Sequence, residues 1–209
     1  MPMKALLIID VQKDFLPAGS LAVPDGDAVI PVINKLQDNF ELVVATQDWH
    51  PADHGSFASS HQGKKPFEKT ELNGLEQILW PDHCVQGSPG AAFADDLKQE
   101  KIAAIFRKGM DAGVDTYSGF YDNGHKKSTG LEAYLKAKNV DEVYVTGLAG
   151  DVCVYFTVLD ALDQGFKTCL VKDATRAVNM QKGDFARALE NMARKGAGIT
   201  ESSSILSAS

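Results

Sequence analysis

Three side chains that together could carry out nucleophilic catalysis lie just beyond apolar runs of the sequence. Asp10 follows the first such run, Lys108 follows another, and Cys153 comes a few residues after a third. A thiolate is a strong nucleophile, a carboxylate can accept the thiol proton, and an ammonium group stabilises the thiolate. Each residue alone is explained as well by an ion pair or a buried thiol. Together they favour a cysteine nucleophile with an acid–base partner.

Cys153 is expected in the first turn of a buried helix. A strand-like apolar run ends at the small-residue turn 147–150, Asp151 stands in an N-cap position, and residues 152–162 are almost wholly apolar. The first turn of a helix has unpaired N–H groups and the positive end of the macrodipole. We therefore predict that the helix terminus and a nearby ammonium group lower the pKa of the Cys153 thiol, and that the N–H groups stabilise an oxyanion.

A second set of residues has the spacing of a metal site. Asp48 and His50 flank Trp49, and alternate residues of an extended segment point the same way, so both side chains can contact one ion. The third ligand must come from elsewhere, and His83 is the first choice. The other candidates are His54, His61, His125 and Cys84. Two imidazoles and a carboxylate suit Zn²⁺ or Fe²⁺, whereas loop histidines at the surface are the alternative explanation.

The elements that must position these residues follow from the hydrophobic pattern. Buried strands are expected at residues 5–9, 42–46, 102–106, 143–146 and 166–171, and helices at 27–40, near 131–135, at 152–162 and at 185–192. Strands that alternate with helices predict an α/β fold with a parallel sheet covered on both faces. Because ligands bind at the carboxyl ends of such strands, we expect the candidate site residues to converge on one edge of the sheet.

Two long stretches without clear periodicity interrupt this pattern. Residues 52–90 are rich in Gly, Pro, His and Ser, and residues 110–127 hold several aromatic side chains. Loops of this length within a compact domain are usually functional or disordered, and the aromatic and histidine content favours a functional role. Residues 199–206 are compatible with a final strand or with a tail.

The composition limits the class of protein. With 209 residues, 44% of them apolar, the chain is expected to form one domain, residues 1–209. A net charge of −7 without a large basic cluster argues against nucleic acid and an anionic membrane as partners. No apolar run approaches the roughly 20 residues of a membrane span, and the first residues lack the features of a signal peptide. Three widely spaced cysteines fit a reducing compartment, so we expect a cytoplasmic protein.

Five stretches of the chain are similar to motifs of one enzyme family. They are LLIIDVQKDFLPAGSLAVP, TQDWHPADHGSFAS, WPDHCVQGSPGA, FRKGMDAGVDTYSGF and GLAGDVCVYFTVLDAL, and they run in order from about residue 4 to about residue 173. In these stretches the chain resembles the nicotinamidase and pyrazinamidase branch of the isochorismatase-like cysteine hydrolase family. The resemblance implies a three-layer doubly wound fold with a mainly parallel central sheet.

The resemblance also implies roles for individual residues. Asp10 matches the general base, Lys108 the lysine of the catalytic triad and Cys153 the nucleophile. The metal ligands match Asp48, His50 and His83, with His54 or Ser56 as the place to look for a further ligand. One divalent ion is implied, with Zn²⁺ as the first choice and Fe²⁺ and Mn²⁺ as alternatives.

Further matches concern the substrate pocket. Phe15 and Trp80 match aromatic residues that line the ring pocket, although either could instead be packed on the core. The Leu148–Ala149 peptide bond matches one that is cis in the family and directs the Ala149 N–H at the oxyanion. Gly150 departs from the family, which commonly has threonine there, and we expect it to loosen the turn. Tyr117 and Phe120 are also plausible pocket walls, with core packing expected for at least one.

The activity that the resemblance implies is hydrolysis of nicotinamide to nicotinate and ammonia, used in NAD salvage, with pyrazinamide as a further substrate. The metal would bind the pyridine nitrogen and orient the ring. The implied partner is the small-molecule substrate, and self-assembly into a homo-oligomer is possible. Two alternatives stay open: a sibling amidohydrolase acting on a ureido or carbamoyl compound, and a non-catalytic metal-binding or redox-sensing module on the same fold.

Overall fold

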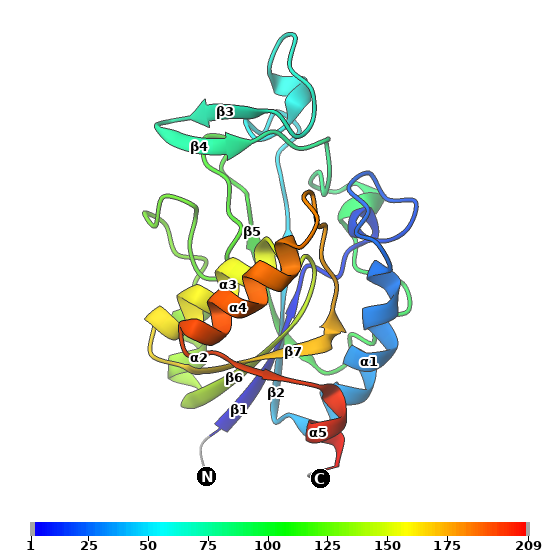
Figure 1. Cartoon of the computed structure of the whole chain (residues 1–209), viewed down its shortest axis with the longest axis vertical. Helices are drawn as coiled ribbons and strands as arrows, with labels where there is room; N and C mark the ends of the chain where they lie inside the picture. Colours follow the sequence, from blue (N-terminus) through cyan, green and yellow to red (C-terminus); the bar gives the residue numbers. More distant parts are fainter. Residues whose placement is uncertain (1–2, 208–209) are drawn as a thin grey trace.

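A six-stranded sheet forms the centre of the computed structural model, which describes residues 3–207 (Figure 1). Its strands are β1 (Met3–Ile9), β2 (Leu42–Asp48), β5 (Ile102–Lys108), β6 (Val140–Gly147), β7 (Lys167–Thr175) and β8 (Gly198–Thr200). Their order across the sheet is β5-β2-β1-β6-β7-β8, and every neighbouring pair is parallel. The five strands expected from apolar runs are confirmed, and the undecided segment after residue 198 adds β8 as an edge strand.

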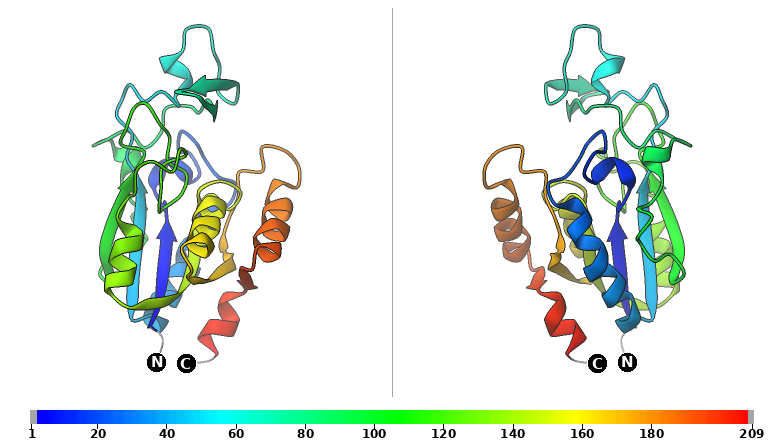
Figure 2. Two further views of the ribbon diagram at one scale, coloured as in Figure 1. Left: turned by 90° about the vertical axis from the view of Figure 1, so that its left-hand side faces the viewer. Right: turned by 90° about the vertical axis from the view of Figure 1, so that its right-hand side faces the viewer.

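Helices cover both faces of this sheet (Figure 2). On one side lie α1 (Val29–Leu36) and α5 (Ser202–Leu206), and on the other lie α2 (Leu131–Ala137), α3 (Cys153–Asp163) and α4 (Asp184–Arg194). Alternate residues of β1 enter the two cores, because successive strand side chains point to opposite faces. The expected three-layer fold is therefore confirmed. No helix between residues 3 and 207 has the length and apolarity to cross a membrane.

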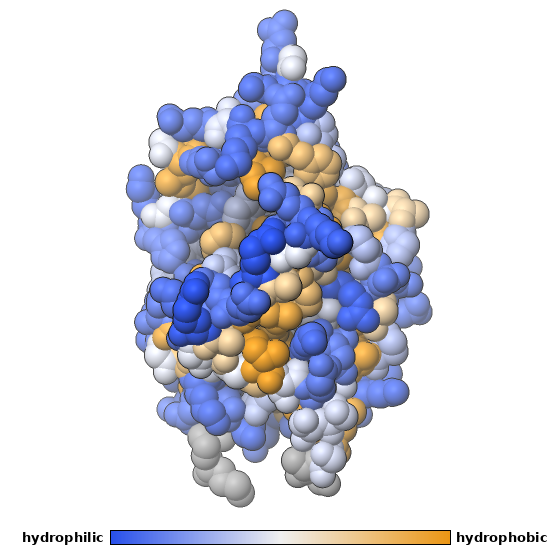
Figure 3. Space-filling model, viewed as in Figure 1, coloured by the Kyte–Doolittle hydropathy of each residue, from blue (hydrophilic) through white to orange (hydrophobic). Residues whose placement is uncertain are grey.

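The surface of the molecule carries few clues to the site. Seen from the side of Figure 1, most residues are hydrophilic, and hydrophobic residues show between them along the middle of the face (Figure 3). A globular fold always leaves part of its apolar surface exposed, so scattered hydrophobic residues need no special explanation.

The long segment 52–90 is more ordered than the sequence analysis expected. It contains an antiparallel hairpin of β3 (Lys69–Leu72) and β4 (Leu75–Ile78), which projects beyond the sheet (Figure 1). Asn73 and Gly74 form its two-residue turn with φ of 49° and 85°. Asn-Gly is a strong hairpin signal, because both residues tolerate the positive φ that this tight turn requires. The interpretation of the whole segment as an irregular loop was wrong for these residues.

The parallel register brings the ends of the strands to one edge. Asp48 at the end of β2 is the register partner of Lys108 at the end of β5, and Ile9 of β1 is the partner of Gly147 of β6. At Gly147, φ is 107° and a Cβ would lie 2.1 Å from the Ile9 carbonyl oxygen. Only glycine permits this close approach of β1 and β6. Asp10 and the turn before α3 therefore start from neighbouring strands.

Candidate active site

Lys108 lies at the centre of the candidate site. Its Nζ is 2.8 Å from Asp10 Oδ2, 2.9 Å from Asp48 Oδ1 and 3.5 Å from Cys153 Sγ, and it donates a further hydrogen bond of 3.0 Å to the Thr116 carbonyl oxygen. All five residues are buried. A buried ammonium group is tolerable only when charged and polar partners replace its water. The structure thus brings Asp10, Lys108 and Cys153 together, as the strand ends predicted.

Asp10 is held in position by the neighbouring strand. The hydroxyl of Thr46 on β2 donates a 2.6 Å hydrogen bond to Asp10 Oδ1 and accepts one of 3.2 Å from the Asp10 backbone N–H. The second carboxylate oxygen is left to face Lys108. Sequence reasoning missed Thr46, because its contact is made across the sheet and leaves no local motif.

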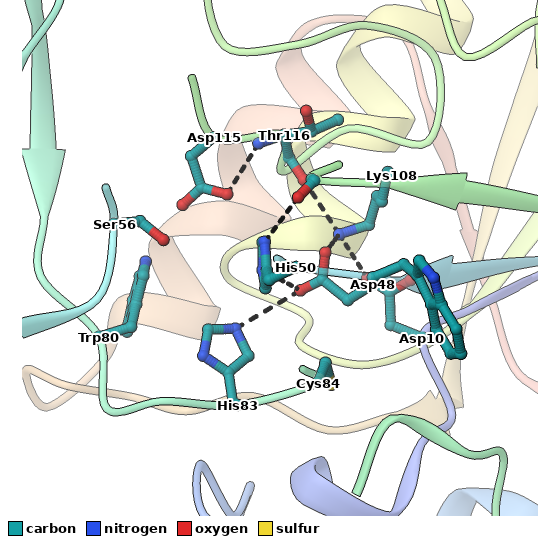
Figure 4. Close-up of polar contacts among 12 residues, drawn as sticks. Asp10, Asp48, His50, Ser56, Trp80, His83, Cys84, Lys108, Asp115 and Thr116 are labelled. Atoms are coloured by element: carbon teal, nitrogen blue, oxygen red, sulfur yellow. Dashed lines mark hydrogen bonds and ion pairs between the residues drawn. The ribbon is translucent and has the colours of Figure 1, made fainter. Parts of the chain in front are cut away.

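Asp48, His50 and His83 form a group that could hold a metal ion (Figure 4). Asp48 Oδ2 lies 3.2 Å from His50 Nε2 and 3.5 Å from His83 Nε2. The Nδ1 atoms of both rings face backbone carbonyl oxygens, of Gly109 at 2.9 Å and of Pro81 at 2.8 Å. A carbonyl oxygen can only accept, so each Nδ1 donates.

This hydrogen bonding favours a cation between the three side chains. With Nδ1 protonated, a neutral ring directs the lone pair of its Nε2 toward the carboxylate oxygen of Asp48. Two lone pairs and a carboxylate repel one another unless a positive charge lies between them, which either a proton on an imidazole or a metal ion supplies. Histidines whose second nitrogen is fixed by a carbonyl oxygen are also typical metal ligands. The donor set therefore fits a divalent ion.

A second group of potential ligands shares His50. His50, His54 and Asp115 also have ligand atoms within 4.8 Å of one another. His54 Nδ1 pairs with Ser56 Oγ at 2.7 Å, whereas its buried Nε2 has no hydrogen-bond partner. Asp115 was missed by sequence reasoning, because it lies in an irregular stretch without a recognisable metal-binding spacing. Its position shows that the candidate site extends toward residues 110–127.

The other candidates for the third ligand lie elsewhere. His61 Nε2 faces the Gly55 carbonyl oxygen at 2.7 Å, and the ring of His125 stacks on Tyr121. Burial and the nearby carboxylates of Asp48 and Asp10 raise the pKa of the Cys84 thiol well above its usual range, which disfavours the thiolate that a metal needs. Among residues 3–207, His83 is the one of the five candidates that joins Asp48 and His50 in a single group.

The buried charges shift the pKa values of the whole site. Burial raises the pKa of Asp10, and the charge of Lys108 offsets this only in part. Burial acts the same way on Asp48, but His50 and Lys108 outweigh it and hold its pKa well below the usual range. The pKa of Lys108 is raised well above its usual range, because Asp10, Asp48 and Cys153 overcome the effect of burial. Asp48 and Lys108 are therefore ionised at neutral pH.

The expected low pKa of Cys153 was wrong for this arrangement. Burial raises the pKa of the thiol well above its usual range, Lys108 opposes this, and the charges of Asp10 and Asp48 raise it further. Polar interaction with the Asp10 carboxylate also favours the protonated form of the thiol. Two carboxylates near one ammonium leave the thiolate without a net positive environment. The resting thiol is protonated and aimed at the group that can take its proton.

The turn before α3 differs from the expected N-cap in one respect. Cys153 lies in the first turn of α3, as predicted, and is its first residue, but Asp151 does not cap the helix. Its carboxylate instead accepts hydrogen bonds from the backbone N–H groups of Val178 and Asn179, which ties the turn to the segment after β7. The Leu148–Ala149 peptide bond is cis, as the resemblance implied.

Beside Cys153 lies a cavity with largely apolar walls. The residues around it include Phe15, Trp80, Tyr117, Ala149 and Cys153, with Asp48, His83 and Asp115 as polar members. The three predicted substrate-binding residues, Phe15, Trp80 and Ala149, thus lie where a ring next to the thiol would be held. Tyr117 is also a wall, whereas Phe120 is fully buried in the core against Phe166. A flat aromatic amide would fit this combination of apolar walls and convergent polar groups.

Gly150 does not leave the turn loose. A Cβ at this position would lie 2.5 Å from Phe185 Cε2 and 2.8 Å from Thr175 Cγ2, so neighbouring side chains already fill the space that a threonine would need. Its N–H donates a 2.7 Å hydrogen bond to the Arg176 carbonyl oxygen. The expectation of a flexible turn was therefore wrong, because packing from α4 and β7 compensates for the missing side chain.

This packing predicts the effect of restoring the threonine. Gly150→Thr should lower the free energy of unfolding by about 1–3 kcal/mol, because the new side chain overlaps Phe185. In a Phe185→Ala background the same substitution should cost clearly less, since the closer of the two clashes is removed and only that with Thr175 remains. Urea unfolding of the wild type, both single variants and the double variant measures this coupling. Equal costs in the two backgrounds would contradict it.

The sequence and the structure are both similar to those of known proteins over nearly the whole chain. The Isochorismatase domain family matches residues 4–204. Nicotinamidase of Escherichia coli K12 is 50% identical over 203 residues, 95% of each chain. A solved nicotinamidase and pyrazinamidase of Acinetobacter baumannii has a TM-score of 0.95 and 45% identity, covering 98% of this chain and 99% of its own. Pyrazinamidase of Pyrococcus horikoshii, solved with zinc, has a TM-score of 0.78 and 37% identity, covering 96% and 99%.

Proposed function

Because the chain belongs to the isochorismatase family, we propose that it is a nicotinamidase, which hydrolyses nicotinamide to nicotinate and ammonia. The observation that carries the proposal is the position of the Cys153 thiol, next to Lys108 and Asp10 and on the wall of a cavity that also contains Asp48 and His83. A nucleophile, an acid–base group and potential metal ligands thus face one small space. The relatives at 45–50% identity are named as nicotinamidases.

The first half of the proposed reaction forms a thioester. Asp10 accepts the proton of the Cys153 thiol, and its raised pKa makes it a stronger base than an exposed aspartate. Lys108 stabilises the thiolate as the S–C bond to the amide carbon forms. The N–H groups of Ala149 and Cys153 hold the oxyanion; within residues 3–207 neither donates to a protein acceptor. The C–N bond then breaks, and Asp10 returns its proton to the leaving ammonia.

The second half releases the product. A water molecule attacks the thioester carbon while Asp10 accepts one of its protons. The same two N–H groups hold the second oxyanion. As the C–S bond breaks, Asp10 returns its proton to the sulfur of Cys153 and the site regains its starting protonation. The product leaves as nicotinic acid, which loses its remaining proton to solvent and becomes nicotinate. Lys108 stays charged throughout, because its carboxylate partners hold its pKa high.

We propose that Asp48, His50 and His83 hold one divalent ion, with Zn²⁺ ahead of Fe²⁺ and Mn²⁺. Their hydrogen bonding supports this, and so does the zinc in the Pyrococcus horikoshii relative. When bound, the ion would supply an attachment point for the pyridine nitrogen and so orient the ring. His54 is proposed as a further ligand or a partner of ion-bound water, because its buried Nε2 is otherwise unpaired.

Several broader expectations belong to the same proposal. Pyrazinamide should also be hydrolysed, since a second ring nitrogen changes the shape of the substrate little.

Residues 1–209 are proposed to form one hydrolase domain, because both cores share the single main sheet. Free Cys84, Cys153 and Cys169 support a reducing, cytoplasmic location. Phe156 and Met180 are half-exposed apolar side chains that line one and the same surface pocket rather than lying scattered, which supports self-association. The proposed small-molecule partner is nicotinamide.

The test is ammonia release from nicotinamide before and after removal of metal by a chelator. We expect turnover to fall by roughly tenfold or more on stripping and to return with added Zn²⁺, because the ring loses its orientation. Benzamide, which lacks the ring nitrogen, is the matched control substrate and should be hydrolysed slowly with or without metal. Hydrolysis of a carbamoyl compound but not of nicotinamide would favour the sibling amidohydrolase. A reactive Cys153 without any turnover would favour the non-catalytic alternative.

A further inference from the structure

Gln77 is the fully buried side chain of a hairpin that is otherwise exposed or half-buried. It lies on β4 with 2% of its surface exposed, whereas the other residues of β3 and β4 all retain contact with solvent. Burying an amide costs free energy unless its polar atoms find partners. The partners of Gln77 therefore indicate why the hairpin turns this side chain inward.

The amide of Gln77 reaches two residues of the cavity wall. Its Nε2 lies 3.0 Å from Asp115 Oδ2 and 3.0 Å from Tyr117 Oη, and 2.7 Å from the Ile78 carbonyl oxygen. Tyr117 Oη also accepts a 3.2 Å hydrogen bond from Trp80 Nε1. The hairpin thus contacts two cavity residues of segment 110–127, and the Tyr117 hydroxyl links it to a third, Trp80.

These contacts determine where the wall lies relative to the thiol. The other oxygen of Asp115 accepts a 2.8 Å hydrogen bond from the Thr116 N–H, and the Thr116 carbonyl oxygen accepts one from Lys108. The middle residue of segment 115–117 is therefore tied to Lys108, and its two outer residues are tied to the hairpin. Figure 4 shows Asp115 and Thr116 on one side of the site and Trp80 on another. Without Gln77, the Tyr117 hydroxyl and the Asp115 carboxylate would each lose a donor in a buried place.

We propose that Gln77 is a positioning residue that holds Tyr117 and Asp115 against the bound ring, so that the β3–β4 hairpin sets the affinity for substrate. The inference rests on the proposed function. It does not involve the thiol chemistry, because Gln77 contacts neither Cys153 nor the two charged residues beside it. Its loss should therefore weaken binding and leave the chemical step nearly intact.

The primary variant is Gln77→Met, which keeps the length of the side chain and removes the amide. We expect the KM for nicotinamide to rise about tenfold and kcat to stay within about twofold. The reason is that the variant loses an interaction that stabilises the bound substrate and the transition state equally. Glu71→Gln introduces an amide at an exposed position of the same hairpin. It is the matched control and should change neither KM nor kcat. An unchanged KM in Gln77→Met, or an equal rise in the control, would overturn the inference.

A second readout does not depend on turnover. Alkylation of Cys153 by iodoacetamide should proceed at the wild-type rate in Gln77→Met, whereas nicotinate should need about tenfold higher concentration to protect the thiol. A merely structural role would alter the alkylation rate itself or the thermal unfolding temperature. Wild-type protein that releases no ammonia would overturn the proposed function, whereas an active wild type with unchanged protection in the variant would overturn only the role of Gln77.

A double-mutant cycle identifies the route of the effect. If Gln77 acts through the Tyr117 hydroxyl, Gln77→Met should raise KM clearly less in a Tyr117→Phe background than in the wild type. Independent, multiplicative effects would overturn that route. If Gln77→Met does not fold, Gln77→Glu is the second variant, because it keeps the shape of the side chain. Its carboxylate lies beside that of Asp115 and should raise KM at least as much. A wild-type KM in Gln77→Glu would overturn the inference.

Discussion

Replacing Cys153 by alanine should lower nicotinamide turnover by roughly 10⁴-fold or more, as removal of a hydrolase nucleophile does. The thiol is the atom proposed to form the covalent bond, and no other described nucleophile contacts Lys108 Nζ. The fold and the potential metal ligands should survive, because Lys108 keeps both carboxylate partners and only one small buried atom is lost. Ammonia release, metal content and thermal unfolding measure the three consequences separately.

Cys169→Ala is the matched control for this experiment. Cys169 is a half-buried thiol on β7, and its pKa is raised to about 11 by burial, so it is not an activated nucleophile. The control should keep normal turnover and normal metal content. Turnover near the wild-type level in Cys153→Ala would show that another group performs the chemistry. Loss of metal in that variant would show that the thiol also stabilises the metal site.

Substituting Asp48 by asparagine should remove both the metal and most of the activity. Asp48 Oδ2 lies 3.2 Å from His50 Nε2 and 3.5 Å from His83 Nε2, and its Oδ1 is one of the two carboxylate oxygens at Lys108. Changes in the residues that merely orient metal ligands already cost 10- to 100-fold in affinity, so loss of the ligand charge should cost roughly 100-fold or more. Competition with a chelator measures the affinity, and ammonia release measures the activity.

The same substitution alters the electrostatics of the catalytic residues. The charge of Asp48 raises the pKa of both Asp10 and Cys153, so its removal should lower both values. Faster alkylation of Cys153 at neutral pH is therefore expected even as turnover falls. Asp95→Asn, at an exposed carboxylate paired with Lys13, is the control and should leave metal, turnover and alkylation unchanged. Retained metal affinity in Asp48→Asn would exclude Asp48 as a ligand.

The strands and the edge where they end follow from short-range patterns. A run such as residues 5–9 is apolar at every position, which is typical of a parallel strand buried on both faces. Parallel strands end at the same edge, so the polar residue after each run is brought near the others without any long-range information. For this reason Asp10, Asp48 and Lys108 could be placed together before the fold was known.

The β3–β4 hairpin could have been predicted from the sequence, although segment 52–90 was expected to be irregular. Leu72 and Leu75 flank Asn73-Gly74, and an Asn-Gly pair between two short strand-like runs is a hairpin signal. The high content of polar residues around it concealed the signal. By contrast, nothing local to Gln77 indicates that its amide contacts Asp115 and Tyr117, because that contact joins segments about 40 residues apart.

By itself, the sequence determined which strands end near Asp10, Asp48 and Lys108, the helix whose first turn holds Cys153, and the spacing of Asp48 and His50. Each depends on neighbours within a few residues. Only the tertiary structure decided the protonation of the Cys153 thiol, the support of Asp10 by Thr46, and the packing of Phe185 over Gly150. The physical reason is that burial and electrostatic interactions depend on distances between atoms, and folding brings distant segments to those distances without a local trace in the sequence.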